Sequence, residues 1–213
     1  MTTETFSGSL AGYTSIGTAA GQISSGQYYA PATAGDLGAY KAAVGAGAQS
    51  AKLYFGAAVS GTFSPERYAW LRLNGSLAAG DYYQLRIVNS SSSNTAPLVQ
   101  CYKWTGGTNT FTGFSASPSA TASDIWEIIE QRDTPSAGQS TISVKQNGTV
   151  LNSFVDTSQF ADSSSTQWVG WGSNRDFNAD LAGGGIDQLD YLPSLAAASS
   201  AIRELITRAA RRL

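Results

Sequence analysis

Two β-rich segments meet at the dipeptide Asn147-Gly148, and this pair constrains the fold more than any other feature of the sequence. The flanking residues, 141–146 and 149–155, are rich in threonine, valine and other residues that favour strands. A two-residue turn between antiparallel strands needs positive φ at both of its positions, which Asn-Gly supplies at little cost. We therefore expect a β-hairpin centred on these two residues.

Further segments with alternating or continuous apolar character predict more strands. In residues 68–73 the alternation predicts that Leu71 and Leu73 share one face of a strand. Trp70 and Arg72 would then share the opposite face. The predicted strands outside the hairpin are 52–59, 68–73, 82–88, 98–104, 124–130, 167–172 and 186–192.

Small residues fill the stretches between these segments, and the chain has 23 glycines and only 13% charged residues. We expect exposed loops at 89–94, which contains four consecutive serines, and at 105–123. Roughly ten short strands with such turns indicate an all-β sandwich of two antiparallel sheets. A single domain spanning residues 1–193 accommodates them.

Residues 194–213 predict a different element, an amphipathic C-terminal α-helix that follows Pro193 and starts at Ser194 as its N-cap. Its apolar residues recur at steps of three and four and form one stripe, and its arginines crowd the C-terminal half. The helix could assemble three copies of the chain, dock on an acidic surface of another protein, or fold back on its own sandwich. The residues assigned to assembly are Ile202, Leu205, Ile206, Leu213, Arg203, Arg208, Arg211 and Arg212.

The charge and composition argue against several classes of protein. A net charge of −2 gives no reason to expect nucleic-acid binding, and no apolar stretch is long enough to span a membrane. The N-terminus lacks the basic and apolar regions of a signal peptide, so we expect synthesis in a cytoplasm. The lone cysteine, Cys101, is expected to be a buried and inert thiol.

Residues 125–192 resemble the concanavalin A-like lectin/glucanase superfamily, and its laminin-G-like jelly rolls in particular. The resemblance implies a jelly-roll sandwich, and residues 5–10 look like its first strand. Stand-alone versions resemble minor tail or capsid decoration proteins in the virions of tailed phages that infect actinobacteria. The phrases that support it are Trp126-Glu127-Ile128-Ile129, the hairpin at 143–150, Ser153-Phe154-Val155-Asp156, Trp168-Val169-Gly170-Trp171-Gly172 and the closing segment 185–190.

Because the superfamily includes glucanases, catalysis has to be considered. Retaining hydrolysis needs two carboxylates about 5 Å apart. Glu127 and Glu130 are three residues apart, so on a strand they face opposite sides. The chain has no histidine for a nucleophilic triad or an imidazole metal site, and no phosphate-binding loop. We expect a protein that is not an enzyme and needs no cofactor.

Ligand binding is the remaining chemistry, because aromatic faces and a few polar groups are what hold sugars. The candidates are Trp104, Trp171, Asn174, Arg175 and Asp176, with Trp168 and Tyr82 nearby. The alternative is that Trp168 and Trp171 belong to the core, as at least one of them should because they lie on opposite faces, and that 174–176 is a solvated turn. Some relatives hold Ca²⁺, and Asp176, Asp180 and Asp187 offer oxygen ligands, although their spacing matches no known calcium motif.

The sequence thus predicts a structural or accessory virion protein that displays a lectin-like domain. Its partners would be other virion proteins and further copies of itself, as an oligomer such as a trimer. The alternative is a carbohydrate-binding module that adheres to glycans of the host cell wall.

Overall fold

The Asn147-Gly148 hairpin is present in the computed structural model, with φ of 51° at Asn147 and 81° at Gly148. It joins β12 (Ser140–Gln146) to β13 (Thr149–Asp156). The structure describes residues 2–24, 26–31, 36–44, 47, 49–55, 66–90, 93–121, 124–163, 168–174 and 186–192. The predicted helix 194–213, with all of its assembly residues, lies outside these ranges.

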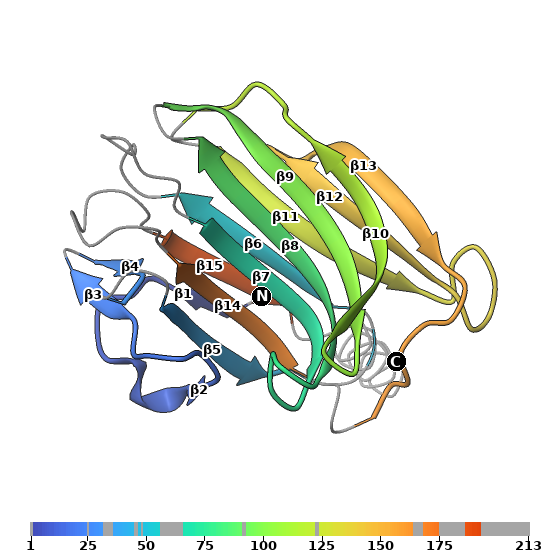
Figure 1. The fold of residues 1–213 in the computed structure, drawn as a ribbon, viewed down its shortest axis with the longest axis horizontal. Coiled ribbons are helices and arrows are strands. Elements are labelled where there is room, and N and C mark those ends of the chain that lie inside the picture. The colour runs from blue at the N-terminus through green and yellow to red at the C-terminus, as the bar shows by residue number, and fades with distance from the viewer. Residues whose placement is uncertain are drawn as a thin grey trace, which may run out of the picture.

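Two antiparallel sheets stack face to face, so the predicted jelly-roll sandwich is confirmed (Figure 1). In chain order, the strands of the first sheet, here sheet A, are β1 (Thr2–Glu4), β3 (Gln22–Ser24), β4 (Gln27–Tyr29), β6 (Ser50–Phe55), β11 (Ile125–Arg132), β12, β13 and β15 (Ile186–Leu192). Those of the second, sheet B, are β2 (Thr14–Ser15), β5 (Leu37–Ala43), β7 (Glu66–Asn74), β8 (Asp81–Ser90), β9 (Ser93–Thr105), β10 (Thr108–Ala116) and β14 (Trp168–Asn174). A short 3₁₀ turn, Leu10–Gly12, precedes β2.

The core lies between the sheets and is built by the period-two alternation of the long strands. Tyr83, Leu85 and Ile87 of β8 all point into it. Cys101 of β9 is also fully buried there, and burial raises the pKa of its thiol. The expectation of a buried cysteine is thus confirmed.

Two predicted loops are largely strand. Residues 108–116 form β10, which pairs with β9 across a Gly106-Gly107 turn whose φ angles are 58° and 73°. The predicted loop at 89–94 is wrong because β8 continues through Ser90 and pairs with Ser93 at the start of β9. Serine can occur within strands, so the serine-rich composition of 89–94 does not require a loop. A two-residue glycine turn permits a tight hairpin, so the glycines at 106 and 107 do not require a long loop either.

The face prediction for β7 fails after Leu71. Arg72 has a φ of 58°, and the pairing with β8 shifts register between Leu71 and Asn74, which is a β-bulge. The bulge turns Arg72 inward, where its Nε donates to Glu130 Oε2 at 2.5 Å, and turns Leu73 to the outer face beside Trp70. A buried carboxylate that pairs with Arg72 is a tertiary feature that simple alternation does not predict.

Candidate functional site: an aromatic groove on sheet B

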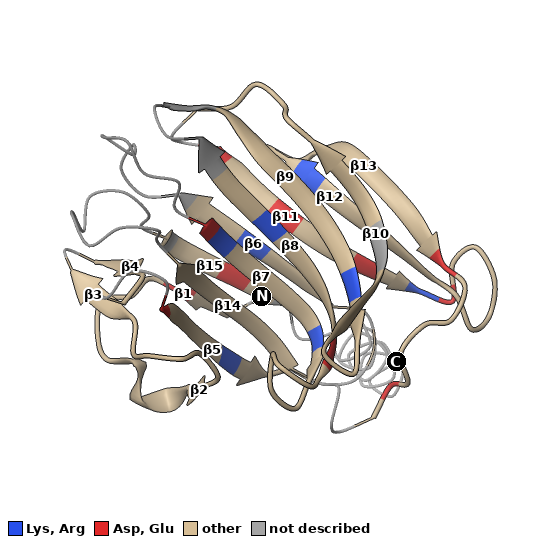
Figure 2. Ribbon diagram, viewed as in Figure 1, with Lys and Arg blue, Asp and Glu red and all other residues tan. Residues whose placement is uncertain are grey.

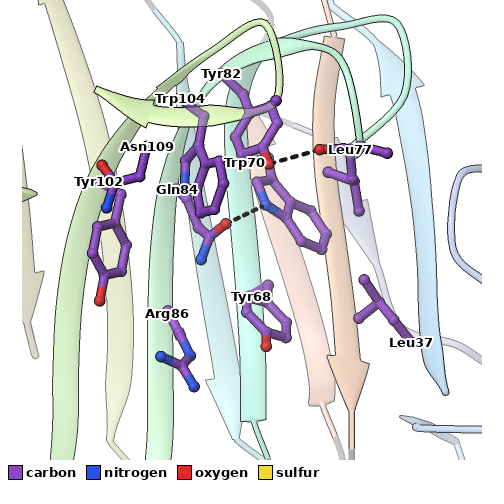
Figure 3. Close-up of a pocket in the computed structure, with 12 residues that line it drawn as sticks. Leu37, Tyr68, Trp70, Leu77, Tyr82, Gln84, Arg86, Tyr102, Trp104 and Asn109 are labelled. Carbon is purple, nitrogen blue, oxygen red and sulfur yellow. Dashed lines mark hydrogen bonds between the residues drawn. The ribbon is translucent and has the colours of Figure 1, made fainter. Parts of the chain in front are cut away.

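The outer face of sheet B has an apolar cluster of its own, separate from the core. Trp70, Leu73, Tyr82 and Ala39 are buried in it, and Trp104, Tyr68 and Leu37 pack against it in part. Beside this cluster lies a groove of about 460 Å³ that crosses β7, β8 and β9 (Figure 3). Apolar rings on the outer face of a sandwich do not contribute to the core, so they mark a candidate binding surface.

Strand register brings the groove residues together. Trp70 of β7, Gln84 of β8 and Tyr102 of β9 are direct cross-strand partners and form one row. Tyr68, Arg86 and Gln100 form the next row. Because directly opposite residues of an antiparallel pair point to the same face, both rows lie on the groove side of the sheet, and all of their residues except Gln100 line the groove.

Two stacked ring pairs form the apolar part of the groove. The rings of Tyr68 and Trp70 are 5.3 Å apart and inclined by 9°, and those of Tyr82 and Trp104 are 5.7 Å apart and inclined by 23°. Trp70 can lie against β14 because the strand has glycine beneath it. A Cβ on Gly172 would come within 2.8 Å of the Trp70 ring, which is closer than real Cβ contacts.

Hydrogen bonds hold these rings in place. Trp70 Nε1 donates to Gln84 Oε1 at 3.2 Å, and the Tyr82 hydroxyl donates to the carbonyl of Leu77 at 2.9 Å (Figure 3). Burial raises the pKa of Tyr82 to about 12, so its hydroxyl remains a donor at ordinary pH. The groove is therefore preorganised at this end.

The other end of the groove is polar. Arg86 donates from Nε to Glu66 Oε2 at 3.2 Å and from Nη1 to Gln100 Oε1 at 3.0 Å, and it also pairs with Glu66 through Nη2. The hydroxyl of Tyr68 donates to the same carboxylate. Burial opposes the charge of Arg86, but the bonds and charge of Glu66 outweigh it and raise the pKa of Arg86. The pair is nearly neutral overall and keeps planar polar groups at the groove.

Two turns close the ring end of the groove. The backbone N–H of Gly107, in the β9–β10 turn, donates to the carbonyl of Gly80, in the β7–β8 turn, at 3.0 Å. A Cβ on Gly107 would lie 1.9 Å from the carbonyl oxygen of Ala78, so the two turns can approach only with glycine here. Asn109, just beyond the turn, is exposed at the groove.

The predicted ligand residues are divided among three places. Trp104 lines the groove, and its Nε1 is buried without a hydrogen-bond partner. Asn174 ends β14 directly opposite Glu66 and Leu37, and its Oδ1 is likewise buried without a partner. Arg175 and Asp176 lie outside the described residues.

The assignment of Trp171 to a ligand site is corrected by the structure. Its side chain is fully buried between the sheets, where its ring lies 4.8 Å from that of Tyr13 and 6.2 Å from that of Tyr40. Trp168, three positions earlier, packs on the outer face beneath Lys41, so the two tryptophans do face opposite sides. Three residues along a strand reverse the face, and only one of the two can be in the core.

Sequence reasoning missed most of the groove. The alternation predicts only that Trp70 shares a face with Arg72, and it does not single out Tyr68, Gln84 or Arg86 as ligand residues. The available signal is that the faces opposite the apolar residues also contain large rings. Aromatic residues on the solvent-facing side of three neighbouring strands are unusual for a surface that has no binding role.

Acidic residues and metal ligands are sparse in the described structure. Glu127 and Glu130 of β11 do lie on opposite faces, since Glu127 pairs with Lys52 outside and Glu130 with Arg72 inside. Among the residues described, no three His, Cys, Asp or Glu side chains gather as metal ligands. Asp176 and Asp180 fall outside these residues, as does the side chain of Asp187.

Among the residues that the structure describes, no helix has the length and apolar character needed to cross a membrane.

Comparison with known proteins shows which solved structures share this fold. No family model matches the sequence, and no curated protein matches it either. Among solved structures, a CBM2 module of the evolved Dit of Lactobacillus casei BL23 phage J-1 has 13% identity and a TM-score of 0.57, covering 89% of this chain and 93% of that one. A legume lectin-like domain from Entamoeba histolytica has 11% identity and a TM-score of 0.58, covering 85% and 90%. The concanavalin A-like jelly-roll architecture is therefore established.

An enzyme also shares this architecture. A prokaryotic β-1,3-1,4-glucanase (lichenase) from a mouse hindgut metagenome has 11% identity and a TM-score of 0.57, covering 90% of this chain and 98% of its own. The expectation that this protein is not an enzyme is thereby corrected, because the same fold supports glycan hydrolysis. The mismatch of Glu127 and Glu130 concerns β11 of sheet A, whereas the groove lies on sheet B and has Glu66 beside it.

Proposed function

We propose that this protein binds carbohydrate in the groove of sheet B. The observation that supports this most is the pair of ring stacks, Tyr68–Trp70 and Tyr82–Trp104, beside the polar side chains that line the same groove. Sugars present apolar C–H faces and hydroxyl edges, so a binding site for them needs flat rings and a few fixed donors and acceptors. The solved structures that share the fold include a carbohydrate-binding module, a lectin-like domain and a glucanase.

The shape of the groove favours a chain of sugar units over a single one. It spans three strands, and the two turns close it only at the ring end, so a ligand of several sugar units can lie along it. Gln84, Arg86 and Asn109 line the groove (Figure 3), and their amide and guanidinium groups could bind sugar hydroxyls. The Glu66 carboxylate cancels most of the charge of Arg86, which favours an uncharged glycan.

The test is a pair of tryptophan variants on the same sheet. Trp104→Ala removes a ring from the groove, whereas Trp168→Ala removes one that packs on the same outer face outside the groove lining. Binding to a panel of cell-wall polysaccharides is measured by affinity electrophoresis and calorimetry. We expect Trp104→Ala to weaken binding about 30-fold or more, the effect of losing a central aromatic contact.

Trp168→Ala should retain binding within a few fold of the unsubstituted protein. If neither variant changes the affinity for a bound polysaccharide, the site lies elsewhere. If no glycan binds at high micromolar concentration of the protein, the proposal is wrong.

We also propose that the protein is displayed on a virion, as a minor tail or capsid decoration protein of a tailed phage of actinobacteria. The module of the phage J-1 Dit supports this setting, since it is a phage component with the same fold. The predicted helix 194–213 would attach the domain to other virion proteins, in one copy or as a trimer, and the groove would contact host cell-wall glycans. The groove and the helix then have separate roles.

Particle imaging tests this setting. Negative-stain images of virions labelled at the C-terminus should place the label at a fixed position on the tail or capsid. A chain truncated after Pro193 should retain glycan binding and no longer join particles. Incorporation of the truncated chain would contradict the role of the helix.

A further inference from the structure

One polar side chain of the groove, that of Gln84, is held in an orientation that decides what it offers to a ligand. Gln84 and Trp70 are both buried at the floor of the groove. An indole N–H can only donate a hydrogen bond, so the Gln84 amide has to turn its carbonyl oxygen toward Trp70. The 3.2 Å bond from Trp70 Nε1 to Gln84 Oε1 has this geometry. The amide nitrogen, Nε2, is therefore turned away from Trp70.

The Nε2 of Gln84 faces the polar end of the groove, the end at which Arg86 lies (Figure 3). Gln84 and Arg86 are two positions apart in β8 and share a face, so their backbones are about 7 Å apart. Among the residues that the structure describes, Trp70 is the one hydrogen-bond partner of the Gln84 side chain. The two N–H groups of the amide are thus available to a ligand.

The acceptors next to Gln84, in contrast, are already bonded to the protein. The Glu66 carboxylate accepts from Nε and Nη2 of Arg86 and from the hydroxyl of Tyr68. Gln100 Oε1 accepts from Nη1 of Arg86 at 3.0 Å. A guanidinium has more N–H groups than these bonds use. This end of the groove therefore has spare donors and few spare acceptors.

The spare donors carry little net charge. Figure 2 shows that charged residues are few on β7, β8 and β9, and those on the groove face of these strands are Glu66 and Arg86, which pair with each other. An anionic ligand would gain little from such a pair. An uncharged carbonyl suits the site better, because its oxygen has two lone pairs and carries no proton, so it can accept from two donors and needs no acceptor in return.

We propose that Gln84 selects N-acetylated glycans, by donating from Nε2, together with Arg86, to the carbonyl oxygen of an acetamido group. This inference rests on the proposed carbohydrate function and names the class of glycan. An amide carbonyl is a stronger acceptor than a sugar hydroxyl, and the acetamido methyl group can pack on the rings of the groove. A hydroxyl in the same place would bring a proton that finds few free acceptors.

Matched oligosaccharides test this selection. Oligomers of N-acetylglucosamine and of glucose with the same β linkage and the same length share a backbone, and they differ only in the acetamido group that replaces one hydroxyl of each unit. Their affinities for the full chain are measured by calorimetry. We expect the acetamido oligomer to bind about tenfold more tightly or better, the effect of one or two added hydrogen bonds. The deacetylated oligomer should bind no better than the glucose oligomer.

A pair of amide-to-acid variants tests the residue. Gln84→Glu keeps the size of the side chain and the acceptor for Trp70 Nε1, and it replaces the amide donors by a carboxylate oxygen. The matched control, Gln100→Glu, places the same charge beside Arg86 but outside the groove lining. At about pH 8, where the carboxyl is ionised, Gln84→Glu should bind the two oligomers almost equally. Gln100→Glu should keep the preference of the unsubstituted chain within a few fold.

NMR follows the donor directly and remains informative if Gln84→Glu does not fold. The side-chain NH₂ signals of Gln84, assigned through its backbone resonances in the unsubstituted chain, should shift when the acetamido oligomer is added. They should shift less with the glucose oligomer at the same occupancy.

Several outcomes would overturn the selection of acetamido groups. These are equal or tighter binding of the glucose oligomer, tighter binding of a glucuronic acid oligomer, an unchanged preference in Gln84→Glu, and NH₂ signals that do not move. The carbohydrate function would still stand in each case if Trp104→Ala weakens the binding of whichever glycan is bound. Failure of every glycan to bind would overturn the proposed function and this inference with it.

Discussion

The outer faces of the two sheets differ in how their side chains are satisfied. On sheet A, Asp190, Lys52, Glu127 and Lys145 are consecutive cross-strand partners, so opposite charges alternate across β15, β6, β11 and β12. On sheet B the corresponding positions are rings and amides around an open groove. Both faces arise from the same alternation of strand residues, and the difference lies only in which side chains face outward.

The comparison indicates where function lies. A face whose charges are paired has little free energy to gain from a ligand, because each group would have to give up its partner. The rings of Tyr68 and Trp104, which are only partly buried, gain free energy when a ligand covers them. Sheet A is therefore the solvated side of the sandwich, and sheet B is the side on which we propose that ligand binds.

The largest contrast should come from removing Trp70, the most buried ring of the groove face. Trp70→Ala should lower the free energy of unfolding by about 3–5 kcal/mol, the cost of a cavity left by a large aromatic residue. Glycan binding should be lost as well, since Tyr68 stacks on this ring. Denaturant unfolding and calorimetry measure both effects. A loss of stability under 1 kcal/mol would mean that this face is not built around Trp70.

A methyl group beneath the same ring should have a smaller effect. Gly172→Ala places a Cβ 2.8 Å from the Trp70 ring and 2.6 Å from the carbonyl oxygen of Gly38. We expect a loss of about 1–3 kcal/mol from overpacking, together with weaker glycan binding as the ring tilts. Tryptophan fluorescence would report the tilt. If Gly172→Ala is destabilised but binds glycan with unchanged affinity, the exact position of the Trp70 ring does not matter for ligand binding.

Parts of this contrast could be predicted from sequence. The Asn147-Gly148 hairpin and the inward face of β8 follow from local turn chemistry and from alternation, which act within a few residues. The strand β10 was missed, although Gly106-Gly107 is itself a two-residue turn signal. The local rules were adequate there, and composition was given too much weight.

The groove could not be assembled by the same reasoning. Its residues come from strands whose register relative to one another depends on distant pairing, such as that of Trp70 with Gln84. The bulge at Arg72 depends on Glu130, which is 58 positions away. Trp104 was named from its residue type alone, and the same reasoning also selected Trp171, which the pairing of β14 turns into the core.

Acid should reduce the stability that the hydrogen bonds to the Asp190 carboxylate of sheet A provide. Burial opposes the charge of Asp190, but bonds from Tyr54, Thr3 and Gln188 outweigh it and lower the pKa of its carboxyl. A pKa lower in the folded than in the unfolded state stabilises the fold above about pH 4 and loses that effect as pH falls through the folded value. Asp190→Asn should therefore be less stable than the unsubstituted protein at pH 7. The difference should shrink below about pH 4, measured by thermal unfolding across pH. A difference that is constant with pH would mean that the carboxylate charge is not what these bonds stabilise.

The smallest effect is expected from the Lys52–Glu127 pair on the outer face of sheet A. Lys52 Nζ lies 3.7 Å from Glu127 Oε1, and the lysine side chain is 34% exposed, so solvent and salt screen the pair. Lys52→Ala should change the free energy of unfolding by less than about 1 kcal/mol, and glycan binding should not change. The matched substitution on the opposite sheet is Arg86→Ala, which leaves the Glu66 carboxylate without its main partner beside the groove. That variant should weaken glycan binding even where its stability is close to that of Lys52→Ala. If the two variants bind glycan equally well, the polar end of the groove does not contact the ligand, and only the stacked rings remain as the site.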